Sequence, residues 1–500
     1  MSGGVKSWKK KEKSGTGIQL NKKTMIAITA LLLGIMLFAG ILTKIVPNGA
    51  YDVDADGGII PGTYHEVSQE EVNYPLWRVL IAPVEVFTTS DSAVGLGIIL
   101  FIILIGGTFL VMEESGVLKY IMQTTVNKFG HKKYILLAVM VFVCMTLSSV
   151  VGILEESVTL VPLACAISLA LGWDSMVGLG FSLMSVAFGY AAATFNPFNV
   201  GVVQTMAGLP MFSGLGFRIF VFLVTYLILF LFLYFYAKKI ERNPEKSVSY
   251  ESDIELRKKF LSEESNEVLK NPNLGKATRV FVTSILCVFV FTAASFIAQQ
   301  FIENDTVSSL IGYTPLVAMA FLFTFGGLRA GYITGIRGKN LLSGFGRGVK
   351  TIAPAIPLIV FVLAITYVLK KGMILDTILY HIYNLIQDFS PVQALLMIML
   401  VVIVIEFFIG SGTAKAFLLM PLILPLAKML NITDQSIVLA FCLGDGFCNV
   451  LYPTSGIMII CIGMINVTYG KFLKWSWKLF VAIFAASAAL IWLAVKIGYC

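Results

Sequence analysis

The chain has 500 residues, of which 57% are hydrophobic and only 13% are charged, and its mean hydropathy is +0.85. Soluble domains carry about a quarter charged residues, so this composition excludes an ordinary soluble protein. The formal net charge is +8, but the basic residues lie between apolar runs and form no extended patch. This distribution argues against nucleic-acid binding.

Apolar runs recur along the chain, and each is long enough to cross a bilayer as a helix, which needs about 20 residues. They cover residues 25–42, 94–112, 217–236, 280–298, 352–369, 392–409 and 479–495. The first run is too long for a signal-peptide core, and no small-residue cleavage site follows it, so it is expected to remain as a membrane helix. The sequence therefore predicts an all-α, multi-pass membrane protein.

Charged segments between these runs predict the orientation, because cytoplasmic loops are rich in Lys and Arg. The basic segment 1–23 is expected in the cytoplasm of a bacterial cell, followed by a first transmembrane repeat at 24–237. Residues 238–277, dense in Lys, Arg and Glu, are expected to form a cytoplasmic linker. A second transmembrane repeat at 278–500 then completes a protein of the cytoplasmic membrane.

Two segments must enter the membrane and turn back for this orientation to hold. They are about 134–171 and 391–430, and each carries polar residues midway, "GILEES" (152–157) and "GSGT" (410–413). Irregular backbone at that depth is tolerated only inside protein or beside a water-filled cavity, so both are expected to be re-entrant hairpins.

A span interrupted by proline follows each hairpin, at "NPFN" (196–199) and at "YPTS" (452–455). The same order occurs twice, and the orientation model places the second copy upside down. Inverted repeats with broken helices near the bilayer midplane are typical of secondary transporters.

Polar residues of the two tips and the two broken spans are expected to converge on one site. The substrate-binding candidates are Glu155, Glu156, Ser157, Asn196, Asn199, Ser411, Gly412, Thr413, Asp445, Asn449, Thr454 and Ser455. Proline leaves backbone carbonyls unpaired, and these can coordinate a cation together with Asn and Thr oxygens. The ion-binding candidates are Thr194, Asn196, Pro197, Thr413, Asn449 and Thr454. Helix N-termini at the tips favour a carboxylate.

Acidic residues in this region indicate function, because a charge buried in the membrane costs about 2.5–3.5 kcal/mol even on a mild scale. Only one of Glu155 and Glu156 is expected to face the site. Glu406 precedes the second tip, and Lys415 is the one base near it. This acidic lining favours a substrate with a cationic group, or carboxylates that titrate in a proton-coupled cycle.

Cysteine and histidine show no pattern of a metal or redox site. The seven cysteines form no CxxC pair, and the three histidines have no ligand spacing. We therefore expect no metal site, no cofactor and no catalytic residues.

Four stretches resemble a known family: "EESVTLVPLACAISLALGWDSMVG", "NPFNVGVVQTMAGLPMFSGLGFR", "GSGTAKAFLLMPLILPLA" and "GDGFCNVLYPTSG". They are similar to the C4-dicarboxylate anaerobic carrier-like family in its YfcC-type branch, within the ion transporter superfamily. The resemblance implies a dimeric elevator transporter in which Ser157 and residues 411–413 lie at hairpin tips. It implies substrates such as C4-dicarboxylates or amino acids, including arginine–ornithine exchange.

The sequence thus predicts a secondary active transporter, not an enzyme, that moves a small carboxylate-bearing metabolite with Na+ or H+ or by exchange. An amino acid, in particular a basic one, is the preferred substrate, and a C4-dicarboxylate is the alternative. Two remote alternatives are a channel and an intramembrane aspartyl protease. "LGDG" resembles the protease motif, but Cys442 replaces its glycine, and Asp52, the required second aspartate, lies in a loop.

Overall fold

The computed structural model describes residues 22–52, 60, 62–72, 74–89, 92–155, 157–210, 212–261, 268–299, 320–386 and 389–500. These residues are mainly helical. A short antiparallel pair of strands, β1 (Gly49–Ala50) and β2 (His65–Glu66), lies in the first loop.

Helices of the first half follow the order of the predicted spans and hairpin. They are α1 (Lys22–Ile45), α2 (Gln69–Val72), α3 (Arg78–Glu85), α4 (Ser92–Glu114), α5 (Val117–Phe129), α6 (Lys133–Val151), α7 (Ser157–Ala170), α8 (Ser175–Leu179), α9 (Ser185–Ala191), α10 (Val202–Met206) and α11 (Leu215–Arg242). Short 3-10 or π turns join some of them: η1 (Val86–Thr88), η3 (Gly180–Met184) and η4 (Pro197–Gly201).

The second half of the chain follows α12 (Tyr250–Leu261). Its helices are α13 (Leu274–Gln299), a helix over 320–333, α15 (Lys339–Ile352), α16 (Ile356–Lys371), α17 (Leu375–Ile386), α18 (Pro391–Glu406), α19 (Gly412–Met429), α20 (Asp434–Gly446), α21 (Gly456–Met464) and α22 (Tyr469–Lys496). The turns η8 (Ala353–Ala355) and η9 (Phe447–Val450) follow α15 and α20.

Five of the seven predicted apolar runs lie within a single helix. The run at 352–369 begins at the end of α15 and crosses η8 before α16, and the run at 392–409 extends past the end of α18. Within the described residues, three helices are long and apolar enough to cross a membrane: 117–151, α11 and α22. A fourth span results if α15 and α16, which meet at a 45° bend, are taken together. This supports a membrane protein.

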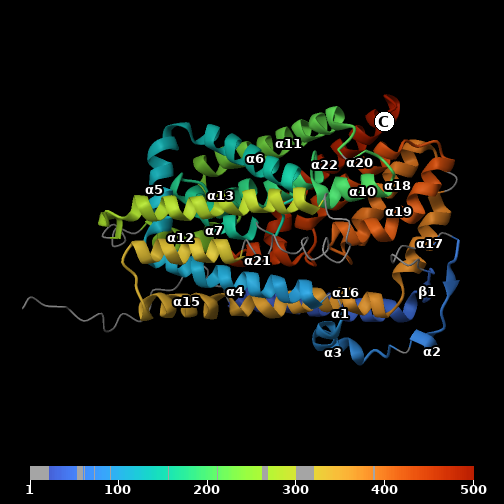
Figure 1. Cartoon of the computed structure of the whole chain (residues 1–500), viewed down its shortest axis with the longest axis horizontal. Coiled ribbons are helices and arrows are strands. Elements are labelled where there is room, and N and C mark those ends of the chain that lie inside the picture. The colour runs from blue at the N-terminus through green and yellow to red at the C-terminus, as the bar shows by residue number, and fades with distance from the viewer. Residues whose placement is uncertain are drawn as a thin grey trace, which may run out of the picture.

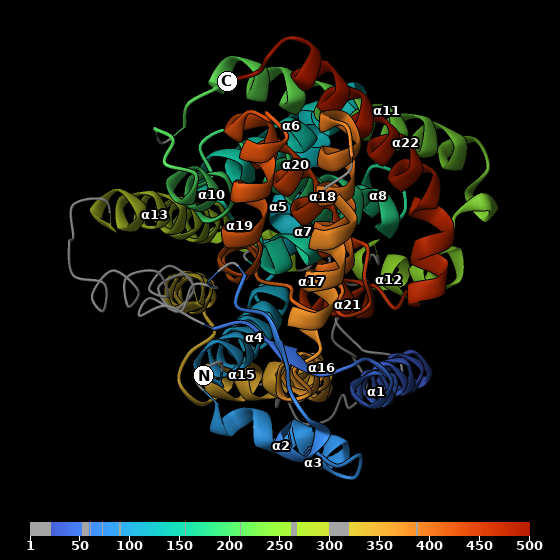
Figure 2. The same cartoon turned by 90° about the vertical axis from the view of Figure 1, so that its right-hand side faces the viewer.

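The helices form two groups that both views separate (Figures 1 and 2). The lower group contains α1, α3, α4, α15 and α16, where α4 packs along α15 and α1 along α16. The upper group contains the helices from α6 to α11 and from α18 to α22. The predicted site residues that the structure describes belong to these helices and to the turns between them.

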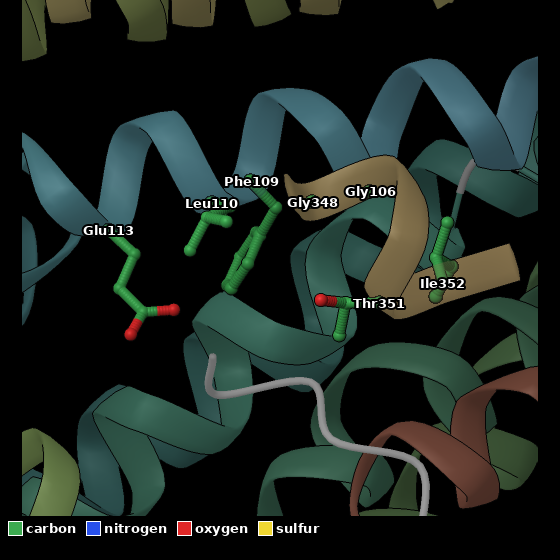
Figure 3. Close-up of a pocket in the computed structure, with 7 residues that line it drawn as sticks. All are labelled: Gly106, Phe109, Leu110, Glu113, Gly348, Thr351 and Ile352. Atoms are coloured by element: carbon green, nitrogen blue, oxygen red, sulfur yellow. The ribbon is translucent and has the colours of Figure 1, made fainter. Parts of the chain in front are cut away.

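Glycine permits the close crossing of α4 and α15. A Cβ atom on Gly348 would lie 2.4 Å from the carbonyl oxygen of Gly106, so neither helix tolerates a larger residue there. Figure 3 shows the small pocket beside this crossing, with Phe109 and Glu113 from α4 and Thr351 from α15 among its lining residues. The pocket contains none of the predicted site residues, and we interpret it as a feature of helix packing.

The predicted linker contains a docked helix. Asp253 of α12 accepts hydrogen bonds from the backbone N–H of Ser175 (3.0 Å) and from the Ser249 hydroxyl (2.7 Å). Leu256 packs on α7 through Leu169. Burial raises the pKa of Asp253 to about 6, and repulsion from the nearby Asp174 carboxylate adds to the effect. The linker helix therefore holds the turn between α7 and α8.

Candidate functional site

Two helix–turn–helix segments lie where the hairpins were predicted. The first is α6 and α7, separated by residues 152–156, and the second is α18 and α19, separated by residues 407–411. The arms of each segment pack on the interrupted helix that follows it: α6 and α7 both contact η3, while α18 and α19 both contact α20. Each pair of arms therefore flanks the next helix in the chain.

The two halves contact each other through the same elements. Helix α19 packs on η4 and α10 of the first half, and α7 packs on α21 of the second half. The interrupted helices cross where Gly446 meets Ala191, since a Cβ atom on Gly446 would lie 2.3 Å from the Ala191 backbone. The second arm of each helix–turn–helix segment thus covers the broken helix of the other half.

The first tip is built around Gly152, which ends α6 in the left-handed conformation with φ +82°. Its lack of a side chain also admits Asn196, whose Oδ1 would lie 2.5 Å from a Cβ atom at residue 152. Nearby, the backbone N–H of Thr194 donates to the carbonyl of Ser149 (3.0 Å), and the two hydroxyls lie 3.0 Å apart. The first tip and the first break are therefore held together.

Asn196 and Asn199 shape the first break. The Oδ1 atom of Asn196 accepts hydrogen bonds from the N–H groups of Phe198 (2.9 Å) and Asn199 (3.3 Å). The amide of Asn199 donates to the carbonyl of Tyr190 (3.2 Å). Within the described residues, the Nδ2 of Asn196 and the Oδ1 of Asn199 are buried without a partner. A buried unpaired polar atom is costly, so this donor and this acceptor suit a ligand.

The remaining candidates of the first tip have different surroundings. Ser157 is fully buried and donates to the carbonyl of Leu154 (2.6 Å), so it stabilises its own turn. Glu155 is half-buried at the tip, and Glu156 lies outside the described residues. Pro197 begins the π turn η4 that resumes the interrupted helix.

The second tip reaches the first break. The hydroxyl of Thr413 donates to the carbonyl of Phe198 (3.1 Å), and Ser411 accepts a hydrogen bond from the N–H of Ala414 (3.3 Å) at the start of α19. Gly412 is buried against the second broken helix, where a Cβ atom would lie 2.9 Å from Oδ2 of Asp445. The candidates of this tip therefore lie between the two broken helices.

A buried charge cluster lies beneath this tip. The Nζ atom of Lys415 lies 2.5 Å from Oδ1 of Asp445 and also contacts Oε2 of Glu406. Lys415 and Asp445 are 0% exposed and Glu406 is 4% exposed. The three residues belong to α19, α20 and α18, so the cluster joins both arms of the second hairpin to the broken helix. The sequence identified all three residues but not their pairing.

Candidates in the second break mainly stabilise the backbone. The amide of Asn449 donates to the carbonyl of Asp445 (3.2 Å), and Ser455 accepts from the N–H of Met458 (3.4 Å) at the start of α21. Thr454 is half-buried in the turn between these elements. Ser149, which the sequence analysis missed, is the residue that connects the first tip to Thr194. Its position just before "GILEES" was the available signal.

No metal site emerges from the part of the chain that the structure describes, where no group of three or more His, Cys, Asp or Glu residues could hold an ion. All seven cysteines are free thiols.

Comparison with known proteins decides the family. The model of the C4-dicarboxylate anaerobic carrier family matches residues 25–496. The chain belongs to this family. It is therefore a member of a family of membrane transporters.

Individual relatives agree with this assignment. The chain is 29% identical to the "Putative basic amino acid antiporter YfcC" of Escherichia coli over 93% of this chain and 96% of the relative. It is 24% identical to an uncharacterized protein of Haemophilus influenzae over 83% of this chain and 77% of the relative.

Two transporters of solved structure are also similar in outline. The YdaH transporter of Alcanivorax borkumensis has a TM-score of 0.44 at 16% identity, with 94% of this chain and 98% of that chain covered. The antimetabolite efflux pump MtrF of Neisseria gonorrhoeae has a TM-score of 0.44 at 19% identity, with 94% and 95% covered.

Proposed function

We propose that this protein is a secondary active transporter of a small carboxylate-bearing metabolite, preferably an amino acid and in particular a basic one. Transport proceeds by exchange or with Na+ or H+ as the coupling ion. The observation that carries the proposal is the first break, where the Nδ2 of Asn196 and the Oδ1 of Asn199 are buried without protein partners. Thr413, in the first turn of α19, contacts the same turn.

The chemistry of this region suits an amino acid. The N-terminus of α19 presents N–H groups and the positive end of the helix dipole, which favour a carboxylate. The amide of Asn196 supplies a further donor. The Oδ1 of Asn199 and the half-buried Glu155 supply acceptors for an amino or guanidino group.

The order of elements supports the proposed inverted repeats at 24–237 and 278–500. In the first half, the amphipathic helix α3 precedes the span α4, and in the second half α15 precedes α16. Each of these leading helices packs on the span of the other half, α3 on α16 and α15 on α4. An inverted second repeat requires one additional helix before α16, so that α16 runs in the direction opposite to α4. The helix over 320–333 is this additional element.

The two helix groups supply a physical basis for the proposed elevator mechanism. The group that holds both hairpins would move against the group of α1, α3, α4, α15 and α16, which would form the homodimer contact in the cytoplasmic membrane. In this proposal the basic N-terminal segment faces the cytoplasm.

A C4-dicarboxylate is the second candidate substrate, because pairing within the charge cluster reduces its attraction for a cation. Glu406 and Asp445 belong to the acidic lining that the sequence predicts, but Lys415 pairs with both of them. One base and two acids leave a charge of −1 instead of −2 in this cluster. The cluster therefore attracts a cationic substrate less strongly than two unpaired carboxylates would.

Counterflow in proteoliposomes tests the proposal. The labelled substrates are arginine, ornithine, a neutral amino acid, succinate and fumarate, each with and without a Na+ or proton gradient. We expect labelled arginine to accumulate when ornithine is inside. Uptake of succinate and of no amino acid would replace the preferred substrate by the second candidate. Flux that needs neither gradient nor counter-substrate and proceeds at channel rates would refute a transporter.

A further inference from the structure

Lys415 occupies a position where a positive charge is not expected on structural grounds. It is the fourth residue of α19, in the first turn, where the positive end of the helix dipole disfavours a cation. It is also 0% exposed. Apolar residues of similar volume in place of all three charged side chains would generally be at least as stable as the buried ion pairs. The charge therefore calls for a functional explanation.

The surroundings of the Lys415 ammonium are those of a small cation site. Carboxylate oxygens of Asp445 and Glu406 contact it from two different helices. Gly412 closes the cluster on the side of the tip, because even a Cβ atom at this residue would lie 2.9 Å from Asp445. Two carboxylates in a closed, oxygen-lined space would attract Na+ if the ammonium were absent.

The first hairpin differs at the corresponding place. Counted from the start of the return arm, the fourth residue of α7 is Leu160, so no basic side chain takes the place of Lys415 there. A coupling ion thus has the first break available, near Thr194 and Asn196, whereas the second hairpin already holds a positive charge.

We infer that the ammonium group of Lys415 is a resident cation, which fills a cation site formed by Glu406 and Asp445 and excludes Na+ from the second hairpin. Only one part of the inference, the place where a coupling ion binds, rests on the proposed transport function. In this scheme any external coupling ion binds at the first break. The cation site itself is testable without any substrate.

The experiment compares purified wild-type protein with the variant Lys415→Ala in NaCl and in choline chloride of equal concentration. Melting temperature and binding of radioactive Na+ are measured. We expect Lys415→Ala to gain about one bound Na+ per chain and a melting temperature several degrees higher in NaCl than in choline chloride. The wild type should bind no Na+ at this site and should show no corresponding rise in melting temperature in NaCl. Lys471→Ala, which removes a base from a partly exposed pair with Glu251, is the control and should gain neither.

Further variants make the result decisive. Adding Asp445→Asn to Lys415→Ala should abolish the new Na+ binding, and persistence of binding would refute the assignment of Asp445. If Lys415→Ala folds in neither salt, the variant Lys415→Gln with Glu406→Gln keeps the net charge of the cluster and leaves Asp445 to bind Na+. No additional Na+ in the folded variant would overturn the inference. Absence of counterflow in the wild type would refute only the proposed transport function, because these measurements use no substrate.

Discussion

Replacing Lys415 by Met should destabilise the protein far more than removing an ordinary ion pair. Removal of one partner from a buried pair typically costs about 3–5 kcal/mol, because the other charge stays buried without compensation. Here Glu406 and Asp445 would both be left, at 4% and 0% exposure. By contrast, the Arg347–Glu114 pair (2.6 Å) is partly exposed, and such pairs contribute about 0–1 kcal/mol.

Melting of the purified protein in detergent, in a buffer without Na+, measures this difference. We expect the melting temperature to fall several times further for Lys415→Met than for Arg347→Met. The triple variant Lys415→Met, Glu406→Gln, Asp445→Asn should recover most of the loss, since it leaves no unpaired charge. Equal losses for the two single variants, or a triple variant as unstable as Lys415→Met, would refute the reasoning.

Three further variants test other parts of the structure. Asn199→Ala should lower counterflow at least about tenfold, because it removes the buried free acceptor. The control Ser487→Ala loses only a hydrogen bond to its own helix and should transport normally. Gly446→Ala should destabilise the protein by about 1–3 kcal/mol through overpacking. Gly456→Ala should not, because Gly456 has open space around it. Equal melting temperatures of the two variants would contradict the close approach of Gly446 to Ala191. The pKa of Asp253 is about 6 in the folded state and about 3.9 in the unfolded state. The folded state therefore holds its proton up to a higher pH, and the free energy of unfolding should fall by roughly 3 kcal/mol as pH rises from about 4 to about 7. Asp253→Asn should flatten that part of the melting profile, and an unchanged slope would exclude Asp253 as its source.

The helices and both turns at the hairpin tips could be predicted because they depend on local sequence. Long apolar runs indicate spans, and polar or glycine residues within them indicate interruptions whatever the surroundings. The predicted breaks at 196–199 and 452–455 accordingly lie within a few residues of the ends of α9 and η9.

Pairing across the site could not be predicted in the same way. Glu406, Lys415 and Asp445 were each identified as charges in apolar surroundings, but a contact between three helices depends on their packing. Likewise, "NPFN" suggested free backbone carbonyls, whereas the structure shows which side-chain atoms of Asn196 and Asn199 are already used within the turn. A single sequence does not give the distances between side chains on different helices.

The docking of α19 on η4 and α10 has a consequence for biosynthesis. The ribosome completes the first break long before it reaches residue 412. In the proposed topology, Asn196 and Asn199 therefore enter the membrane without the helix that later covers them. Polar side chains at that depth are costly without partners. A nascent chain that ends at α11 should therefore be held by the insertion machinery or recognised by proteases, and only translation of α19 would release it as a stable protein.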